Sequence, residues 1–148
     1  MTTPHLSRDL AVALRDAGLR WSPAAGDRFV IPQPELDGHV FTLSDMTIEA
    51  HEYPTGTILG FNGTTEWALD SVAKDEALWL PREDQLRELL GGVFVSLHRE
   101  GPGDSAGYVV TTRGEDGEPR EDRAGSAVDA YAHALLALVR RAKADVVA

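Results

Sequence analysis

Short apolar segments joined by tight turns restrict the fold of this chain more than any other feature. Segments 46–52 and 57–61 are separated by Pro54-Thr55-Gly56, and segments 93–99 and 107–112 by a Gly-Pro-Gly-Asp-Ser turn. Proline and glycine favour such turns. Because parallel strands need a long crossover connection, links of this length predict antiparallel hairpins.

Three further segments have helical periodicity. The first covers 8–17, with Ser7 placed to cap its start and Gly18 to end it in a left-handed conformation. The second follows Pro81 and ends at Gly91-Gly92. The last begins with a capping-box-like pair, Ser126 and Asp129. Its apolar residues recur at helical spacing: Val128, Tyr131, Leu135, Leu138 and Ala142.

The order of these elements predicts the α+β class: a mostly antiparallel sheet with three helices packed on it, as a two-layer or an α-β-α sandwich. The length of 148 residues and the 43% hydrophobic content fit one domain over residues 1–148. The segment 65–80 fits either a strand or a short helix, and we favour the strand.

Charge and composition narrow the partners. The net charge is −10, which disfavours nucleic acid and favours solubility or a basic protein partner. The chain has no cysteine, so thiolate catalysis and cysteine-ligated metals are excluded. It has no apolar run long enough to span a membrane and no secretory signal, so we expect a cytoplasmic protein without membrane contact. The oligomeric state stays open.

The familiar catalytic motifs are weak or missing. Residues 103–107 read G-x-S-x-G, but that serine falls between two expected strands, where a hairpin loop explains it better than a nucleophile elbow. The five histidines match no zinc motif, although His98 and Glu100 share a strand face and can pair. No glycine pattern fits a phosphate loop. We therefore expect no catalytic residue, metal or cofactor.

The segment 61–70 is the most unusual in the chain. It combines a tight turn, two hydroxyls, carboxylates and a tryptophan, which suits a recognition loop. The plainer alternative is a turn followed by a core tryptophan, and Trp21, Trp67 and Trp79 can form one aromatic cluster in the core. The candidate binding residues are Asn62, Thr64, Thr65, Glu66, Trp67 and Asp70.

Several runs resemble a known family. GDRF at 26–29, FNGTTEWALDSV at 61–72 and LWLPREDQLRELL at 78–90 look like a family of small uncharacterised actinobacterial proteins, some of them named for pilus assembly of the CpaE type. AGSAVDAYA at 124–132 is more weakly similar to small phage α/β-sandwich proteins, and more loosely to HicB-type antitoxins. Neither resemblance implies a catalytic site.

Three functions fit these patterns. The leading hypothesis is a non-catalytic accessory or protein-interaction protein, because no catalytic constellation is assembled. The second is an antitoxin or immunity-type inhibitor that docks its acidic surface on a basic enzyme. The third is a small hydrolase or ligand-binding protein that uses Glu66, Asp70 or a histidine in a concave pocket.

Overall fold

The computed structural model describes residues 4–34, 36, 38–44, 48–54, 56–61, 71–103 and 106–147. Its contacts divide the chain into two compact units. The helical unit combines Met1–Arg20 with Arg82–Ala148, and the aromatic unit is Trp21–Pro81. Each unit is described by itself below, and the single domain expected over residues 1–148 stays a prediction.

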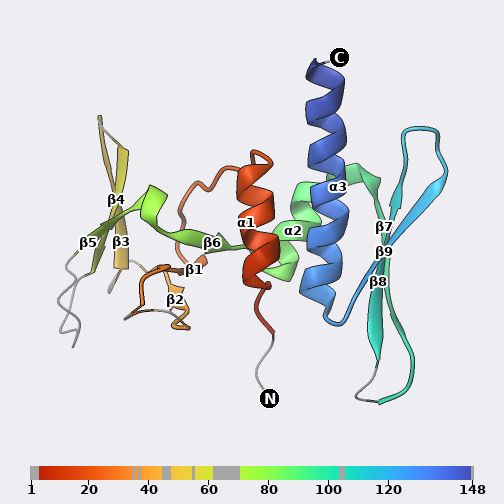
Figure 1. Ribbon diagram of the computed structural model, residues 1–148, viewed down its shortest axis with the longest axis horizontal. Coiled ribbons are helices and arrows are strands. Elements are labelled where there is room, and N and C mark those ends of the chain that lie inside the picture. Colours follow the sequence, from red (N-terminus) through yellow and green to blue (C-terminus); the bar gives the residue numbers. More distant parts are fainter. Residues whose placement is uncertain are drawn as a thin grey trace. The chain divides into compact units, whose positions relative to one another are not determined.

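The described residues of the helical unit form one sheet and three α-helices. The helices are α1 (Arg8–Asp16), α2 (Glu83–Leu90) and α3 (Ala127–Val147). Strands β7 (Phe94–Glu100), β8 (Gly107–Arg113) and β9 (Pro119–Ala124) form an antiparallel sheet in that order, and a short 3-10 helix, η2 (Gly91–Val93), precedes β7. Helix α3 lies against β8 and β9, and both α1 and α2 pack on α3 (Figure 1).

The C-terminal end of α1 follows from its sequence, whereas the Ser7 hydroxyl expected to cap its start makes no capping hydrogen bond. After the last turn, Gly18 takes a φ of 113°, which favours glycine. Its N–H donates to the Arg15 carbonyl at 3.0 Å, and the Leu19 N–H donates to the Leu14 carbonyl at 3.0 Å. These two bonds are a Schellman motif, so the glycine terminates the helix as predicted. Ala11 and Leu14 form its buried face.

The predicted capping of α3 is confirmed. The Ser126 hydroxyl accepts a hydrogen bond from the Asp129 N–H at 3.2 Å. The Asp129 carboxylate in turn accepts one from the Ser7 N–H at 2.9 Å, which ties the start of α1 to the start of α3. Most of α3 between Val128 and Leu136 is buried, and the Tyr131 ring packs on Phe94 with centroids 5.6 Å apart.

Strand β9 is an element that the sequence did not reveal. The chain around it suggests only a turn at 114–119 followed by the last helix. Its residues, PREDRA, are polar and mostly exposed, because β9 is an edge strand with one neighbour. Hydrophobic alternation therefore gives no signal here, although each residue has a register partner on β8.

In the aromatic unit, the part of the chain that the structure describes forms two small antiparallel sheets. The first orders its strands β2 (Phe41–Thr42), β1 (Arg28–Val30) and β6 (Leu78–Leu80); the second orders them β3 (Ile48–Tyr53), β4 (Gly56–Phe61) and β5 (Ser71–Ala73). A 3-10 helix, η1 (Lys74–Glu76), lies between β5 and β6. The predicted hairpin is confirmed, with Tyr53 opposite Gly56. In the segment 65–80, the described residues include two strands, β5 and β6, as favoured.

Stacked aromatic rings and one buried carboxylate organise the core of this unit. Trp21 stacks on Trp79 at 6.3 Å and lies 5.5 Å from Phe29, measured between ring centroids. Asp27 is only 3% exposed, and its Oδ2 accepts hydrogen bonds from the Trp21 indole N–H at 2.8 Å and from the Ala24 N–H at 3.0 Å. The expected pairing of Trp21 with Trp79 in the core is confirmed, while Trp67 lies outside the described residues.

These observations confirm the α+β class and the antiparallel pairing. They also refine the expected architecture, because the strands of the described residues form three three-stranded sheets rather than one. In the helical unit, α3 lies against the sheet, and α1 and α2 pack on α3.

Candidate interaction groove

The six binding residues expected from the sequence, Asn62 to Asp70, lie outside the described residues. Their neighbours in the chain are β4 and β5, which pair with each other, so the segment connects two adjacent strands. The recognition loop at 61–70 thus stays a prediction, and so does its alternative as a turn before a core tryptophan. The described residues form a different candidate site, a groove in the helical unit.

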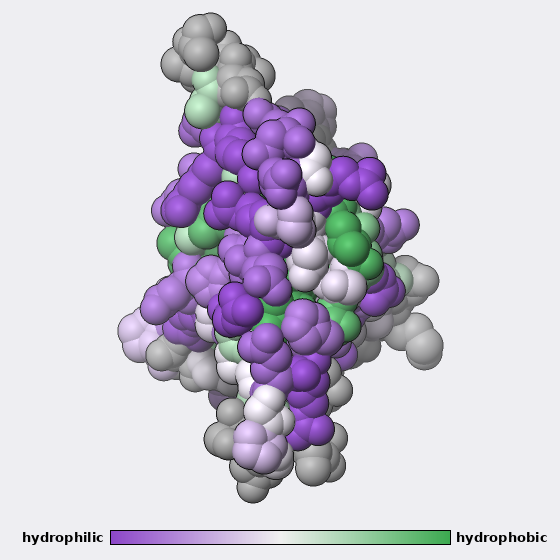
Figure 2. All heavy atoms as spheres, turned by 90° about the vertical axis from the view of Figure 1, so that its right-hand side faces the viewer, coloured by the Kyte–Doolittle hydropathy of each residue, from purple (hydrophilic) through white to green (hydrophobic). Residues whose placement is uncertain are grey.

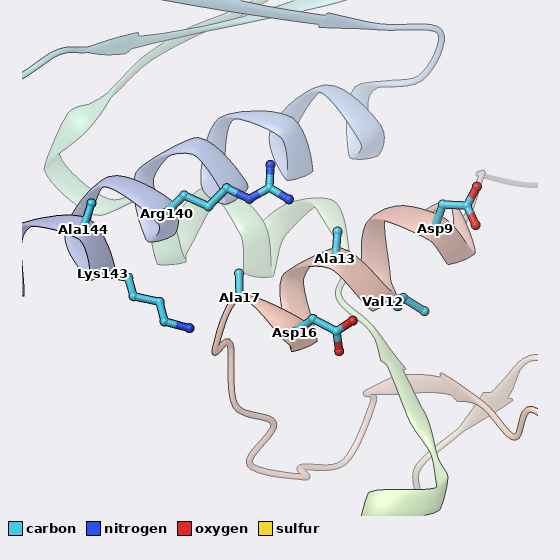
Figure 3. A pocket seen from close by; sticks show the side chains of 8 residues that line it. All are labelled: Asp9, Val12, Ala13, Asp16, Ala17, Arg140, Lys143 and Ala144. Carbon is cyan, nitrogen blue, oxygen red and sulfur yellow. The ribbon is translucent and has the colours of Figure 1, made fainter. Parts of the chain in front are cut away.

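A groove of about 730 Å³ lies between α1 and α3 in the helical unit (Figure 3). Aliphatic side chains and opposite charges line it: Asp9, Val12, Ala13, Asp16, Ala17, Arg140, Lys143 and Ala144. The α1 side of the groove follows from the spacing of its residues in the sequence, because positions 9, 12, 13, 16 and 17 share one face of a helix. The alanines on both helices leave the space that larger side chains would fill.

The two helices start together and end apart. The bond from the Ser7 N–H to Asp129 aligns their N-terminal ends. With nine residues, α1 spans about 14 Å, whereas the 21 residues of α3 span about 31 Å. The last turns of α3 therefore continue past the end of α1 (Figure 1). There the helix is exposed at Arg140, Lys143 and Ala144.

The two helices that form the groove carry opposite charges. Asp9 and Asp16 belong to α1, whereas Arg140 and Lys143 extend from α3 toward α1 (Figure 3). By the helical rise, Asp9 and Lys143 are separated by about 18 Å along the axes. Among the described residues, Asp16 pairs with Arg15 at 3.2 Å, and no ion pair engages Asp9, Arg140 or Lys143. The groove therefore has an acidic wall on α1 and a basic wall on α3, both open to a partner.

The chemistry of this groove suits docking rather than bond making. Its described lining consists of methyl and isopropyl groups, two carboxylates, one guanidinium and one ammonium group, without a hydroxyl or an imidazole. Apolar surface between charged walls is what an amphipathic helix contacts when it binds.

A second polar surface lies on the face of the β7-β8-β9 sheet opposite α3. The predicted pair is confirmed, with His98 Nε2 at 3.5 Å from Glu100 Oε1. Arg123 of β9 contacts Glu100 at 3.3 Å and Glu121 at 3.4 Å. The hydrogen bond from Arg123 holds the pKa of Glu100 below its ordinary value. Hydrophilic residues dominate this side of the molecule (Figure 2), as in a solvated sheet face.

A smaller hollow of about 410 Å³ adjoins the turn between β8 and β9. Glu115, Asp116 and Glu118 line it together with Arg120 and Arg141. Acidic and basic groups are mixed here without an apolar floor, and we assign no ligand to it.

Comparison of the chain with protein-family models, with curated proteins and with solved structures finds no match. The resemblance to actinobacterial and phage families accordingly stays a prediction. Within the described ranges, no helix combines the length and the apolar content that crossing a membrane requires. The same ranges contain no group of three or more histidine and carboxylate side chains that could bind a metal ion.

Sequence reasoning missed the groove, although its signal is present. Asp9, Val12 and Asp16 recur at helical spacing on the side of α1 opposite Leu14. Arg140 and Lys143 are explained equally well as charges that favour the end of a helix. Only the pairing of α1 with α3, which are more than 100 residues apart in sequence, brings the two sets together.

Proposed function

We propose that this chain is a non-catalytic interaction protein that docks a helix of another protein molecule in the groove between α1 and α3. The observation that carries the proposal is the composition of this groove, an aliphatic floor flanked by acidic and basic walls. Helices pack with their axes about 8–10 Å apart when the contact side chains are small, and the groove supplies such residues at positions 13, 17 and 144. We further propose that it acts in the cytoplasm.

The net charge supports a second candidate, an inhibitor that covers a basic enzyme. The chain carries 24 acidic and 14 basic residues, which would speed association with a positively charged partner. Within the groove, however, the two aspartates are balanced by Arg140 and Lys143. The groove therefore favours a partner with both charges, and the inhibitor hypothesis needs another surface.

Cross-linking from the groove tests the proposal. Because the chain has no cysteine, Ala17→Cys creates a single site for a benzophenone-maleimide label. Leu89→Cys on α2, where the side chain is 44% exposed, is the matched control outside the groove. After illumination in a lysate of the native cells, we expect one dominant adduct from the label at position 17 and none from position 89.

Mass spectrometry of the adduct then identifies the peptide that occupies the groove. Equal labelling from both positions, or labelling from neither, would contradict a docking role for this groove. Saturable turnover of a small molecule that is lost in one point variant would instead favour the hydrolase hypothesis.

A further inference from the structure

We infer that the occupant of the groove is a second copy of this chain, so that two molecules associate about a twofold axis through α1 and α3. The inference rests on the proposed function, because it names the molecule that fills the same groove. Charge supports the inference. One wall of the groove is acidic and the other is basic, so each wall can pair with the opposite wall of a second copy.

The positions of the charges fit a symmetric contact. Turning a second copy end for end places its Asp9 and Asp16 beside Arg140 and Lys143 of the first copy. Twofold symmetry then repeats the contact, because whatever α1 of one copy makes with α3 of the other is made again in reverse. A single groove thus gives two sets of opposite-charge contacts. An unrelated partner would need the same pattern in its own sequence, whereas this chain already has it.

The apolar surface supports the same arrangement. Val12, Ala13 and Ala17 are half-buried on α1, while Ala144 is exposed on α3. Leu138 and Val139 are also only half-buried, although α3 is closely covered through Leu136. A second α1 laid along the exposed part of α3 would shield Ala144 and remove further apolar area from water, which drives association.

Long-range repulsion limits how strong the association becomes. Each copy carries a net charge of −10, which opposes the approach of two molecules. At physiological ionic strength, charges separated by more than about 8 Å are largely screened, whereas contacts inside the groove are closer and partly shielded from solvent. We therefore expect a reversible dimer rather than a permanent one.

Charge reversal with complementation tests the inference. One variant combines Asp9→Lys with Asp16→Lys, and the other combines Arg140→Glu with Lys143→Glu. Alone, each variant would place like charges opposite each other across both halves of the dimer. Mixed together, the two variants would restore opposite charges in both halves. Sedimentation equilibrium of the full chain measures association, and circular dichroism confirms that each variant is folded.

We expect the dissociation constant to rise at least about tenfold in either variant alone, because several exposed pairs of about 0.2–1 kcal/mol each are reversed. The equimolar mixture should return to within about threefold of the wild-type value. The matched control, Glu115→Lys with Glu118→Lys on the β8–β9 turn, makes the same change in net charge away from the groove and should not weaken the dimer.

A wild-type chain that stays monomeric would overturn the inference, and so would a mixture that fails to associate while the wild type does. Weakening by the control variant equal to that by the α1 variant would also overturn it, because net charge alone would then explain the result. These failures differ from failure of the proposed function. A monomer that still forms the position-17 adduct with another protein loses this inference and retains the docking groove.

Discussion

The helical unit and the aromatic unit use different means to hold their elements together. In the helical unit, most of the buried residues that are described belong to the three helices, and Tyr131 of α3 is 1% exposed. In the aromatic unit, aromatic rings pack together, and one of them, the indole of Trp21, donates a hydrogen bond to the buried carboxylate of Asp27. Helix packing is therefore the main support of the first unit, whereas aromatic packing beside a buried carboxylate supports the second.

The largest effects should come from removing the central ring of either core. Phe29 is 0% exposed and belongs to a cluster of buried hydrophobic residues of the aromatic unit. We expect Phe29→Ala to lower the free energy of unfolding by ~3–5 kcal/mol, because a large buried side chain is replaced by a cavity. Hydrogen exchange should accelerate in β1 and β6 and stay unchanged in the middle of α3.

Tyr131→Ala is the matching change in the helical unit, with a loss of similar size. Its accelerated exchange should appear in α3 and in β7, where Phe94 contacts the ring. Equal acceleration over both units in both variants would contradict separate cores, because the two cores would then unfold as one.

The buried carboxylate gives the next largest effect. Asp27→Ala removes the acceptor for the indole N–H of Trp21 and leaves that donor buried without its partner. Such a loss costs about 1–3 kcal/mol. Urea unfolding followed by tryptophan fluorescence measures it. Asp27→Asn keeps one acceptor oxygen and should lose less than Asp27→Ala. If the alanine variant matched the wild type, the aromatic unit would not depend on this hydrogen bond.

A smaller effect separates the two predicted helix caps. The Ser126 hydroxyl accepts a hydrogen bond at the start of α3, whereas the Ser7 hydroxyl makes no capping hydrogen bond at the start of α1. Ser126→Ala should therefore cost about 1 kcal/mol, and Ser7→Ala should be close to neutral. Thermal or urea unfolding of both variants decides the point, and equal losses would refute the distinction.

The smallest effect concerns the polar face of the β7-β8-β9 sheet. The hydrogen bond from Arg123 lowers the pKa of Glu100 in the folded chain. Its contribution to stability is therefore present above the ordinary glutamate pKa of about 4.3 and lost as pH falls through the lower folded-state value. Glu100→Gln should flatten the acid dependence of unfolding slightly, while Glu115→Gln on the turn provides the control. A steeper acid dependence in Glu100→Gln would contradict this sign.

The parts of the fold that could be predicted are those with a local sequence signal, and they occur in both units. The caps at Gly18 and Ser126 are local, so the sequence alone located the helices well. The hairpin of β3 and β4 was also predicted, because its turn residues are adjacent in the chain. Strand β9 was missed because an edge strand pairs with one neighbour only and can be polar. Its sequence therefore shows no apolar alternation. Its pairing with β8 depends on a contact that hydrophobic periodicity does not encode.

The candidate site was predictable only in part, for the same reason. A helical projection of α1 shows Asp9, Val12 and Asp16 on one face, but it does not show what faces them. Arg140 and Lys143 become part of a groove only when α3 packs beside α1. The binding residues chosen from the sequence, at 62–70, lie outside the described residues, and their role stays a prediction.

In the proposed dimer, a second copy covers the groove between α1 and α3. Hydrogen exchange of the wild-type chain tests it most directly, at protein concentrations well above and well below the dissociation constant of the dimer. We expect slower exchange at high concentration in segments 8–17 and 137–144, and no change in β8. Equal exchange at both concentrations in these two segments, or slowing confined to another surface, would contradict it.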